Sequence, residues 1–198
     1  MNCIEKINHY LKGYCEGKDV LEVGSMDGES RLRTLLTNQC VNSYTGIDIQ
    51  MGINVDYDCY AEDILEVFNP DEFDIIVSSN VLEHVYGWQD AIHGMKTVCK
   101  TGGLIAMTVP SAYPYHKDPE DHWRYSITDM RLIFSDFDIL EIHEVKQDAS
   151  AYVPGVPANE IDAREVFILA CKPTNFKEIN LEGYKLHNIK EGEWTKLK

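Results

Sequence analysis

Hydrophobic residues along the chain fall into two alternating patterns. Short apolar runs typical of buried strands occur at four places: 19–24, 44–49, 73–79 and 103–110. Apolar residues at helical spacing lie between several of these runs, most clearly over 29–37 and 81–100. Two further strand-like runs, 137–145 and 164–172, follow one another with no helical pattern between them. Strands separated by helices predict a parallel sheet, whereas two consecutive strands predict an antiparallel hairpin.

Weaker patterns complete the expected path of the chain. Apolar residues at helical spacing in 2–17 predict a helix that packs on the edge of the sheet. A short strand is expected at 53–56 and a helix at 127–135. The polar and aromatic loop 111–126 is too long to be a simple connector. Residues 173–198 are polar and weakly patterned, so we expect them to form a loose C-terminal extension.

These elements together predict an α/β fold. Its sheet is expected to be doubly wound, seven-stranded and mostly parallel, with an antiparallel C-terminal hairpin strand and helices on both faces. A single domain is expected over 1–172, with its N-terminal helix inside 1–17, followed by the extension 173–198.

Composition narrows the classes of partner that the chain can bind. Lys and Arg number 18 against 33 for Asp and Glu, which gives a net charge of −15. Because no basic patch is visible either, binding to nucleic acid is not expected. The six cysteines form no C-x-x-C pair, which argues against a zinc knuckle or a redox dithiol. No apolar run is long enough to span a bilayer and no signal peptide is visible, so we expect a cytoplasmic protein.

The stretch 19–30, DVLEVGSMDGES, carries the strongest chemical signal. A buried strand delivers Glu22 and Gly24 to its carboxyl end, and Gly28 precedes the next helical pattern. Glycine lets the backbone approach a ligand closely. Asp48 ends the following strand, where a carboxylate can accept hydrogen bonds from both hydroxyls of a ribose. Strand, glycine turn, helix, strand and acid, in this order, predict a nucleoside site.

These residues resemble those of the class I S-adenosylmethionine-dependent methyltransferases, in the small-molecule branch with a Rossmann-like fold. The similarity covers 18–172. The family's first motif is an acid, any residue, and then glycines at alternate positions. Glu22, Gly24 and Gly28 match this motif, but Met26 stands in place of the middle glycine. The resemblance implies an enzyme whose cofactor is S-adenosylmethionine.

Two later segments extend the resemblance. YAEDI, at 60–64, is similar to the segment that flanks the adenine, although Tyr60 stands where the family often has an acid. FDIIVSSNVLEHV, at 73–85, resembles the family's fourth strand and the turn after it. The resemblance therefore implies the following cofactor contacts: Glu22, Gly24, Ser25, Gly28, Asp48, Ile49, Ala61, Glu62, Ser79 and Asn80.

Other nucleotide-binding motifs do not fit the sequence. A nicotinamide-binding G-x-G-x-x-G would need glycines at 24, 26 and 29, but the chain has Gly24, Met26 and Glu29. A phosphate-binding loop would need G-K-[ST], which the sequence lacks. A non-catalytic protein that binds S-adenosylmethionine or S-adenosylhomocysteine stays open as an alternative, because Met26 and Tyr60 both depart from the family pattern.

For the methyl acceptor, the sequence favours an oxygen over a nitrogen atom of a small molecule, a sugar or glycan, or a lipid intermediate. A hydroxyl acceptor calls for a general base, and His84 and His122 are the expected catalytic residues. The segment PEDHWRYS, at 119–126, is similar to a loop in bacterial family members that modify sugars or lipids. Substrate contacts are expected from the same loop: His116, Trp123, Arg124 and Tyr125.

Each of these side chains also has a purely structural interpretation. His84 could be bonded to backbone at the start of a helix, Asp48 could cap a turn, and Glu22 could pair with a buried cation. Three residues of the long loop could simply hold that loop against the sheet: Trp123, Arg124 and Tyr125.

The long loop also raises the question of a metal ion. It contains imidazoles and carboxylates of the kind that bind divalent ions: His116, Asp118, Glu120, Asp121 and His122. Their spacing matches no ligand template, so no metal site is expected. The sequence leaves the oligomeric state open, and a homodimer is compatible with it.

Overall fold

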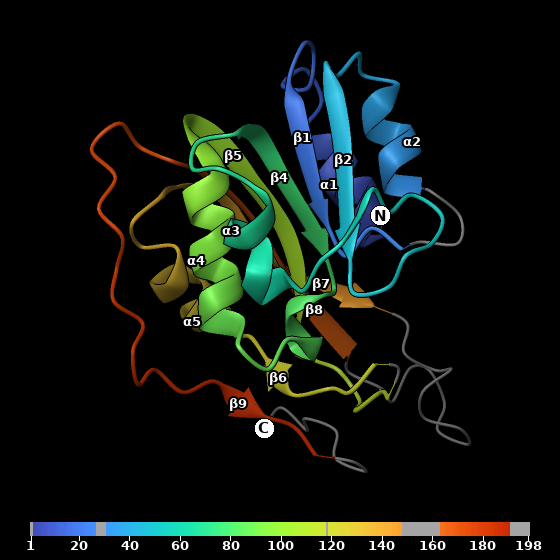
Figure 1. Ribbon diagram of the computed structural model, residues 1–198. Coiled ribbons are helices and arrows are strands. Elements are labelled where there is room, and N and C mark those ends of the chain that lie inside the picture. Colours follow the sequence, from blue (N-terminus) through green and yellow to red (C-terminus); the bar gives the residue numbers. More distant parts are fainter. Residues whose placement is uncertain (1, 27–30, 118, 148–162, 191–198) are drawn as a thin grey trace.

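The computed structural model describes residues 2–26, 31–117, 119–147 and 163–190. Its centre is a seven-stranded sheet with strand order β3-β2-β1-β4-β5-β8-β7 (Figure 1). These strands are β1 (Asp19–Val23), β2 (Ser43–Asp48), β3 (Tyr57–Asp58), β4 (Phe73–Ser79), β5 (Cys99–Ala112), β7 (Asp138–Gln147) and β8 (Ala163–Cys171). β8 runs antiparallel between β5 and β7, and the pairs from β3 to β5 are all parallel. The predicted mostly parallel sheet with an antiparallel hairpin is confirmed.

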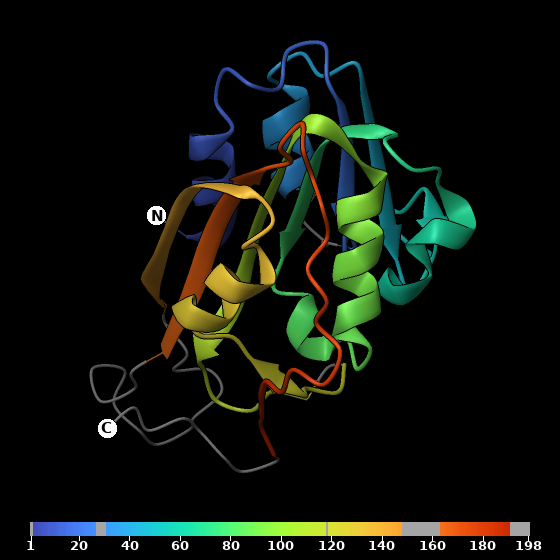
Figure 2. The ribbon, with the colours of Figure 1, turned by 90° about the vertical axis from the view of Figure 1, so that its left-hand side faces the viewer.

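Helices cover both faces of this sheet, as the two ribbon views show (Figure 2). One face carries α1 (Cys3–Tyr10) and α2 (Arg31–Thr37), and their buried residues join one apolar cluster. The other face carries α3 (Ile64–Val67), α4 (Trp88–Val98) and α5 (Ile127–Ile133), which pack into a second and larger cluster. The apolar side chains of the inner strands alternate between the two clusters, because successive residues of a strand point to opposite faces.

Several elements differ from the predicted boundaries. The helix predicted at 81–100 is divided into a 3-10 turn, η2 (Leu82–His84), and α4, because Val85 adopts an extended conformation between them. The strand expected at 53–56 forms at β3 instead. The N-terminal helix α1 begins with a capping box, in which the Asn2 and Glu5 side chains each accept a backbone N–H of the other residue, and it ends well before residue 17.

A buried ion pair joins α4 to the turn after α5. The Lys96 ammonium donates to both carboxylate oxygens of Asp136 at 2.8 Å and to the carbonyl of Ile133 at 2.6 Å. It also lies over the rings of Phe134 and Phe137, at 5.2 and 5.7 Å from their centroids. Burial lowers the pKa of Lys96, and the Asp136 carboxylate opposes that shift. Helix α4 is therefore held to the turn after α5 by charge as well as by apolar contacts.

The C-terminal residues 173–190 pack against the domain and are not the loose extension that their average polarity predicted. This segment, drawn in red in Figure 2, passes over α4 and α5. Leu181, Leu186 and Ile189 are buried, and the Tyr184 hydroxyl donates to Asp129 at 2.6 Å. Widely spaced apolar residues thus anchor a segment whose other residues are polar. Its last element, β9 (His187–Asn188), pairs with β6 (Trp123–Arg124) in the long loop.

Replacing Lys96 tests the contribution of the buried pair. In Lys96→Met the Asp136 carboxylate stays buried and loses its cation, so we expect the free energy of unfolding to fall by about 3–5 kcal/mol. The matched control is Lys18→Met, because Lys18 forms a half-exposed pair with Asp74 and its loss is expected to cost less than about 1 kcal/mol. Urea denaturation of both variants measures the difference. Equal losses in the two variants would contradict this account of α4.

Candidate functional site

The carboxyl ends of the parallel strands meet at one edge of the sheet. Val23 at the end of β1 is aligned with Ile47 of β2 and with Ser78 of β4. Ser79 in turn is aligned with Thr108 of β5. In open α/β sheets, ligands bind outside these ends where the strand order reverses, which here is between β1 and β4.

The bend after β1 depends on a glycine. Gly24 has a φ of +80°, in the left-handed region that other residues avoid. A Cβ added to Gly24 would lie 2.1 Å from Cγ2 of Val81, in the turn after β4. The backbone N–H groups of Gly24 and Ser25 both donate to the Ile47 carbonyl at 2.9 Å. The loops after β1 and β4 can therefore touch only with glycine at this position. Gly28, the other predicted glycine of the motif, lies outside the described residues.

Asp48 ends β2 with its carboxylate held by backbone. Oδ2 accepts the N–H of Met26 at 3.1 Å, and Oδ1 accepts the N–H of Gln50 at 3.3 Å. A carboxylate has about four acceptor positions, so two bonds leave capacity for a ligand's hydroxyl groups. The first of these bonds also ties the loop after β1 to the end of β2. Asp48 is thus fixed in orientation while keeping free acceptor positions.

Apolar side chains surround Asp48 although the surface there is exposed. Ile49 is 46% exposed and Tyr60 is 60% exposed, and the backbone N–H of Cys59 donates to the Asp48 carbonyl at 2.8 Å. Met26 is also exposed, with its sulfur 3.0 Å from the position that a Cβ of Gly52 would take. Exposed apolar side chains grouped beside a fixed carboxylate suit a flat ring joined to a hydroxyl-bearing sugar.

Four other predicted cofactor residues lie beneath or beside this edge. Glu22 is buried on the face of α1 and α2, where its carboxylate accepts the Tyr44 hydroxyl at 2.8 Å. Ser25 is buried, and its hydroxyl has no hydrogen-bond partner among the described residues. Ala61 is buried in η1 (Ala61–Asp63), and the Glu62 carboxylate accepts the N–H of Gly87 at 3.3 Å. Their contact with a cofactor stays a prediction.

Asn80 joins this edge to a neighbouring cavity. It has a φ of +55°, which is uncommon for a residue with a side chain and is a form of strain found at functional sites. Its N–H donates to the Thr108 carbonyl at 3.0 Å, while Nδ2 donates to Glu165 at 2.8 Å. The hydroxyl of the preceding Ser79 lies 3.2 Å from the hydroxyl of Thr108. The end of β4 is therefore bonded to both β5 and β8.

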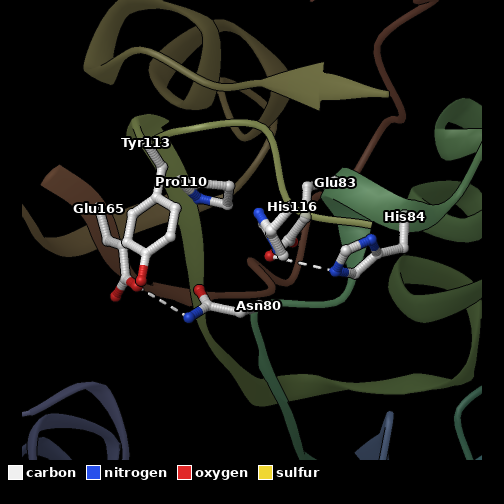
Figure 3. A pocket seen from close by; sticks show the side chains of 7 residues that line it. All are labelled: Asn80, Glu83, His84, Pro110, Tyr113, His116 and Glu165. Atoms are coloured by element: carbon white, nitrogen blue, oxygen red, sulfur yellow. Dashed lines mark hydrogen bonds and ion pairs between the residues drawn. The ribbon is translucent and has the colours of Figure 1, made fainter. Parts of the chain in front are cut away.

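The cavity lies between the ends of β4, β5 and β8 and has a volume of about 230 Å³ (Figure 3). Most of the side chains around it are polar or ionisable. They come from the turn η2, from the end of β5 and its loop, and from β8: Asn80, Glu83, His84, Pro110, Tyr113, His116 and Glu165.

Two histidines that line this cavity lie against each other, and each has a hydrogen-bonding partner on its Nδ1 side. Nδ1 of His84 lies 3.0 Å from the Glu120 carbonyl, and Nδ1 of His116 lies 3.1 Å from Oδ2 of Asp121. The ring centroids are 4.9 Å apart, with the rings nearly perpendicular. Burial lowers the pKa of His84, so its ring is neutral near pH 7. Burial also raises the pKa of Glu83, whose side chain is 1% exposed, to about 8.

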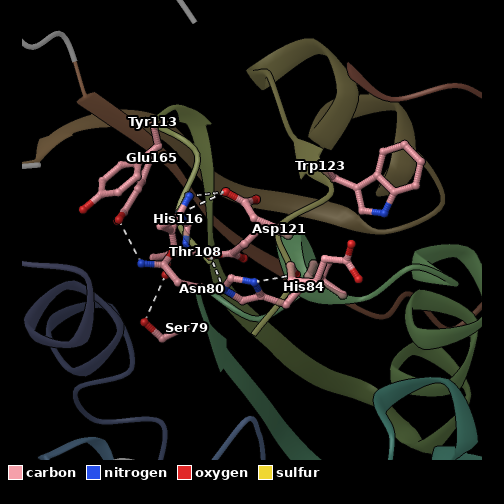
Figure 4. A network of polar contacts seen from close by, with 12 residues as sticks. Ser79, Asn80, His84, Thr108, Tyr113, His116, Asp121, Trp123 and Glu165 are labelled. Carbon is pink, nitrogen blue, oxygen red and sulfur yellow. Dashed lines mark hydrogen bonds and ion pairs between the residues drawn. The ribbon is translucent and has the colours of Figure 1, made fainter. Parts of the chain in front are cut away.

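The long loop is fixed by Arg124, which is 2% exposed. Its guanidinium donates to both oxygens of Asp121 at 2.6 and 2.7 Å and to the carbonyls of Tyr113 and Pro114 at 3.0 Å. Burial alone would raise the pKa of Asp121, but hydrogen bonds from Arg124 and His116 hold it well below its usual range. Figure 4 shows Asp121 beside His116. For Arg124, the contacts favour the interpretation that it pins the loop.

The aromatic neighbours of Arg124 also bond to backbone. The Tyr125 hydroxyl is fully buried and donates to the Leu82 carbonyl at 2.9 Å, and Nε1 of Trp123 donates to the Val85 carbonyl at 3.0 Å. His122 lies beside the ring of Tyr86 and does not line the cavity. Of the predicted catalytic and substrate residues, the cavity therefore brings together His84 and His116.

Four lining residues were not predicted from the sequence, namely Glu83, Pro110, Tyr113 and Glu165. The sequence does offer a reason to single out Glu165. It is an acid inside the apolar run REVFILAC, and a buried acid needs a polar partner. In the structure it is paired with Pro110 across β5 and β8 and bonds to Asn80. The positions of Glu83 and Tyr113 carry no comparable signal.

Comparisons with known proteins agree with this geometry. The chain matches the methyltransferase-domain family over residues 3–147. No curated protein sequence matches it significantly. A candidate methyltransferase of Bacillus halodurans C-125 is similar in structure, with a TM-score of 0.66 and 16% identity over 86% of this chain and 99% of that chain.

Two further solved structures share the fold. The 1,6-didemethyltoxoflavin N1-methyltransferase of Burkholderia thailandensis, solved with its namesake compound and S-adenosylhomocysteine, has a TM-score of 0.62 and 11% identity over 86% of this chain and 78% of that chain. The [4+2]-cyclase SpnF has a TM-score of 0.63 and 16% identity over 86% of this chain and 79% of that chain. At such identities the likeness shows the fold alone.

The family match supports membership of a family, whereas the structural likeness supports the fold alone. It extends from α1 to the end of β7, so it includes the bend after β1, the acid at the end of β2 and the turn after β4. Among the described residues, no helix combines the length and the apolar composition needed to cross a membrane. The chain belongs to the class I S-adenosylmethionine-dependent methyltransferases and is an enzyme that uses this cofactor.

Proposed function

We propose that this enzyme methylates an oxygen atom of a small polar molecule, or of a sugar or lipid intermediate whose reacting end enters the cavity between β4, β5 and β8. The observation that supports this most is the cavity itself. It is lined mostly by polar side chains, and one of them, Asn80, follows β4 at the same edge of the sheet as Asp48. Its volume of about 230 Å³ is below the range of roughly 300–1,000 Å³ of pockets for drug-sized ligands. A compact acceptor, or one group of a larger acceptor, matches that size.

The edge at β1 and β2 fits the adenosyl part of the cofactor. Asp48 keeps acceptor positions for the two ribose hydroxyls, and exposed Ile49 and Tyr60 offer apolar surface to an adenine ring. Gly24 keeps the bend free of side-chain atoms where the loops after β1 and β4 touch. Glu22, Ser25 and Ala61 are buried next to this edge.

The bound cofactor supplies a methyl group on a positive sulfonium. Attack by an acceptor oxygen on that methyl carbon, in line with the carbon–sulfur bond, gives a methyl ether, S-adenosylhomocysteine and a proton. The protein's part is to hold the acceptor oxygen in line, and such positioning contributes roughly 7–11 kcal/mol to lowering a barrier. Asn80, Tyr113 and Glu165 offer hydrogen bonds that orient hydroxyl groups. His84 and His116 lie where the reacting hydroxyl would lose its proton.

An acceptor screen with labelled cofactor tests the proposal directly. The purified enzyme is incubated with methyl-labelled S-adenosylmethionine and panels of small hydroxy compounds, sugars, lipid intermediates and amines. We expect label in a product stable to mild acid and base, as a methyl ether is, and fewer counts with His116→Gln. Label found only in amines, or no transfer to any acceptor by enzyme that binds S-adenosylhomocysteine, would overturn the proposal.

Replacing Asp48 tests the cofactor half of the site. A hydrogen bond to a charged group contributes about 1.5–3 kcal/mol, so Asp48→Ala is expected to weaken S-adenosylhomocysteine binding by roughly 10–100-fold. Asp138→Ala is the matched control, because Asp138 is an exposed acid on the distant edge strand β7. Isothermal titration measures both affinities. If the two variants bind equally well, Asp48 is not a ribose ligand.

Replacing Gly24 separates a steric effect from backbone strain. Gly24→Ala brings both a left-handed alanine and a collision with Val81, whereas Gly13→Ala, at a φ of +88°, meets nothing within 4 Å. Left-handed strain alone costs roughly 1–2 kcal/mol. We therefore expect Gly24→Ala to lose more stability than Gly13→Ala and to lose affinity for S-adenosylhomocysteine as well. Melting temperatures and titrations compare the two, and Gly24→Ala/Val81→Ala should recover part of the loss. Equal behaviour of the two single variants would contradict the contact.

A further inference from the structure

Three potential metal ligands from two separate loops meet in the cavity. Glu83 and His84 belong to the turn η2 after β4, and His116 lies in the loop after β5 (Figure 3 and Figure 4). One ligand atom from each residue lies within 4.8 Å of the other two. Oε1 of Glu83 is 3.8 Å from Nε2 of His84.

Both imidazole rings are oriented in the way that metal-binding histidines are. In metal sites, the nitrogen that does not bind the ion usually donates to a carboxylate or a backbone carbonyl. Here Nδ1 of His84 lies 3.0 Å from the Glu120 carbonyl, and Nδ1 of His116 lies 3.1 Å from the Asp121 carboxylate. Each ring would therefore bind an ion through Nε2.

The support behind His116 is itself fixed. Asp121 accepts two hydrogen bonds from Arg124, one on each oxygen, and both residues are almost fully buried. Asp121 also accepts the backbone N–H of His116 at 3.0 Å. A buried charge pair of this kind holds the ring in one position without contacting the cavity itself.

Glu83 gives an independent sign that a cation belongs here. Its side chain is 1% exposed, lines the cavity, and has one carboxylate oxygen, Oε2, with no hydrogen-bond partner among the described residues. A buried carboxylate oxygen without a partner is costly. No Lys or Arg of the described residues forms an ion pair with Glu83, and nearby Glu165 adds a further buried acid. A bound cation would satisfy the unpaired oxygen.

We propose that Glu83, His84 and His116 bind a divalent transition metal ion, with an open coordination position that faces the cavity. Two imidazoles and one carboxylate are a ligand set used for Zn²⁺ and for Fe²⁺, and three protein ligands leave room for a further oxygen ligand. In a tetrahedral site with bonds of about 2.1 Å, ligand atoms are roughly 3.4 Å apart. The three side chains would thus converge by about 1 Å when they bind the ion.

The sequence predicted no metal because the spacing of the loop residues 116–122 fits no ligand template. Glu83 and His84 come from a different segment, and only the parallel pairing of β4 with β5 brings them to His116. The role of the ion rests on the proposed function. A metal ion lowers the pKa of a hydroxyl or water bound to it, so it would make the acceptor oxygen a better nucleophile. With the ion bound, His84 and His116 would act on the hydroxyl proton through the metal and not as direct proton acceptors.

Cobalt binding tests the site without relying on activity. The full chain is treated with a chelator and titrated with Co²⁺, whose visible absorption reports its coordination. We expect one equivalent to bind, Zn²⁺ to displace it, and Glu83→Gln, His84→Gln and His116→Gln to remove the absorption. Asp121→Asn should weaken binding by about 10–100-fold, because it only orients His116. Titration with S-adenosylhomocysteine confirms that each variant is folded.

The control is His93→Gln, since His93 is an exposed histidine beside Glu178 that could bind metal adventitiously. Loss of Co²⁺ binding in this variant, or equal binding by wild type and the three ligand variants, would overturn the site. The metal site and the proposed methylation can also be disproved independently of each other. Metal-free enzyme that methylates at the full rate would remove the catalytic role of the ion and leave the proposed function intact. Enzyme that binds one Co²⁺ but transfers no methyl group would do the reverse.

Discussion

The parallel pairing of β1 with β4 is the constraint on which the other features depend. From β1 the chain proceeds to β2 and β3 on one side, and it returns to β4 and β5 on the other. The loops that leave β1 and β4 therefore diverge, and the space between them opens at one edge of the sheet. Gly24 and Val81 are the point at which the two loops still touch.

Two environments of different character lie on either side of it. Around Asp48 the surface is open, the carboxylate is held by two amides, and apolar side chains are exposed. Beyond Asn80 the cavity is partly enclosed, and burial raises the pKa of Glu83 and lowers the pKa of His84. The methylation proposed above would use both environments side by side. Asn80, bonded to β5 and to β8, fixes the distance between them.

The sequence predicted what short-range patterns encode. Apolar runs located the strands, and the spacing of Glu22, Gly24 and Asp48 indicated a nucleoside edge. It did not predict partners brought together by folding, because periodicity carries no record of distant pairing. Lys96, a charged residue within the helical pattern 81–100, is buried against Asp136. Arg124 looked equally suited to substrate or structure, and only the position of Asp121 separates the two. Glu83 and His84 are neighbours in the sequence, but only the pairing of β4 with β5 brings them close to His116.

The pairing of β9 with β6 makes the cavity's loop depend on a distant part of the chain. Ile189 donates its N–H to the His122 carbonyl, and Asn188 bonds the same carbonyl through its side chain. Residues 187–189 leave the ribosome only after every strand of the main sheet has been synthesised. The contacts that hold this wall of the cavity are therefore the last that the growing chain supplies.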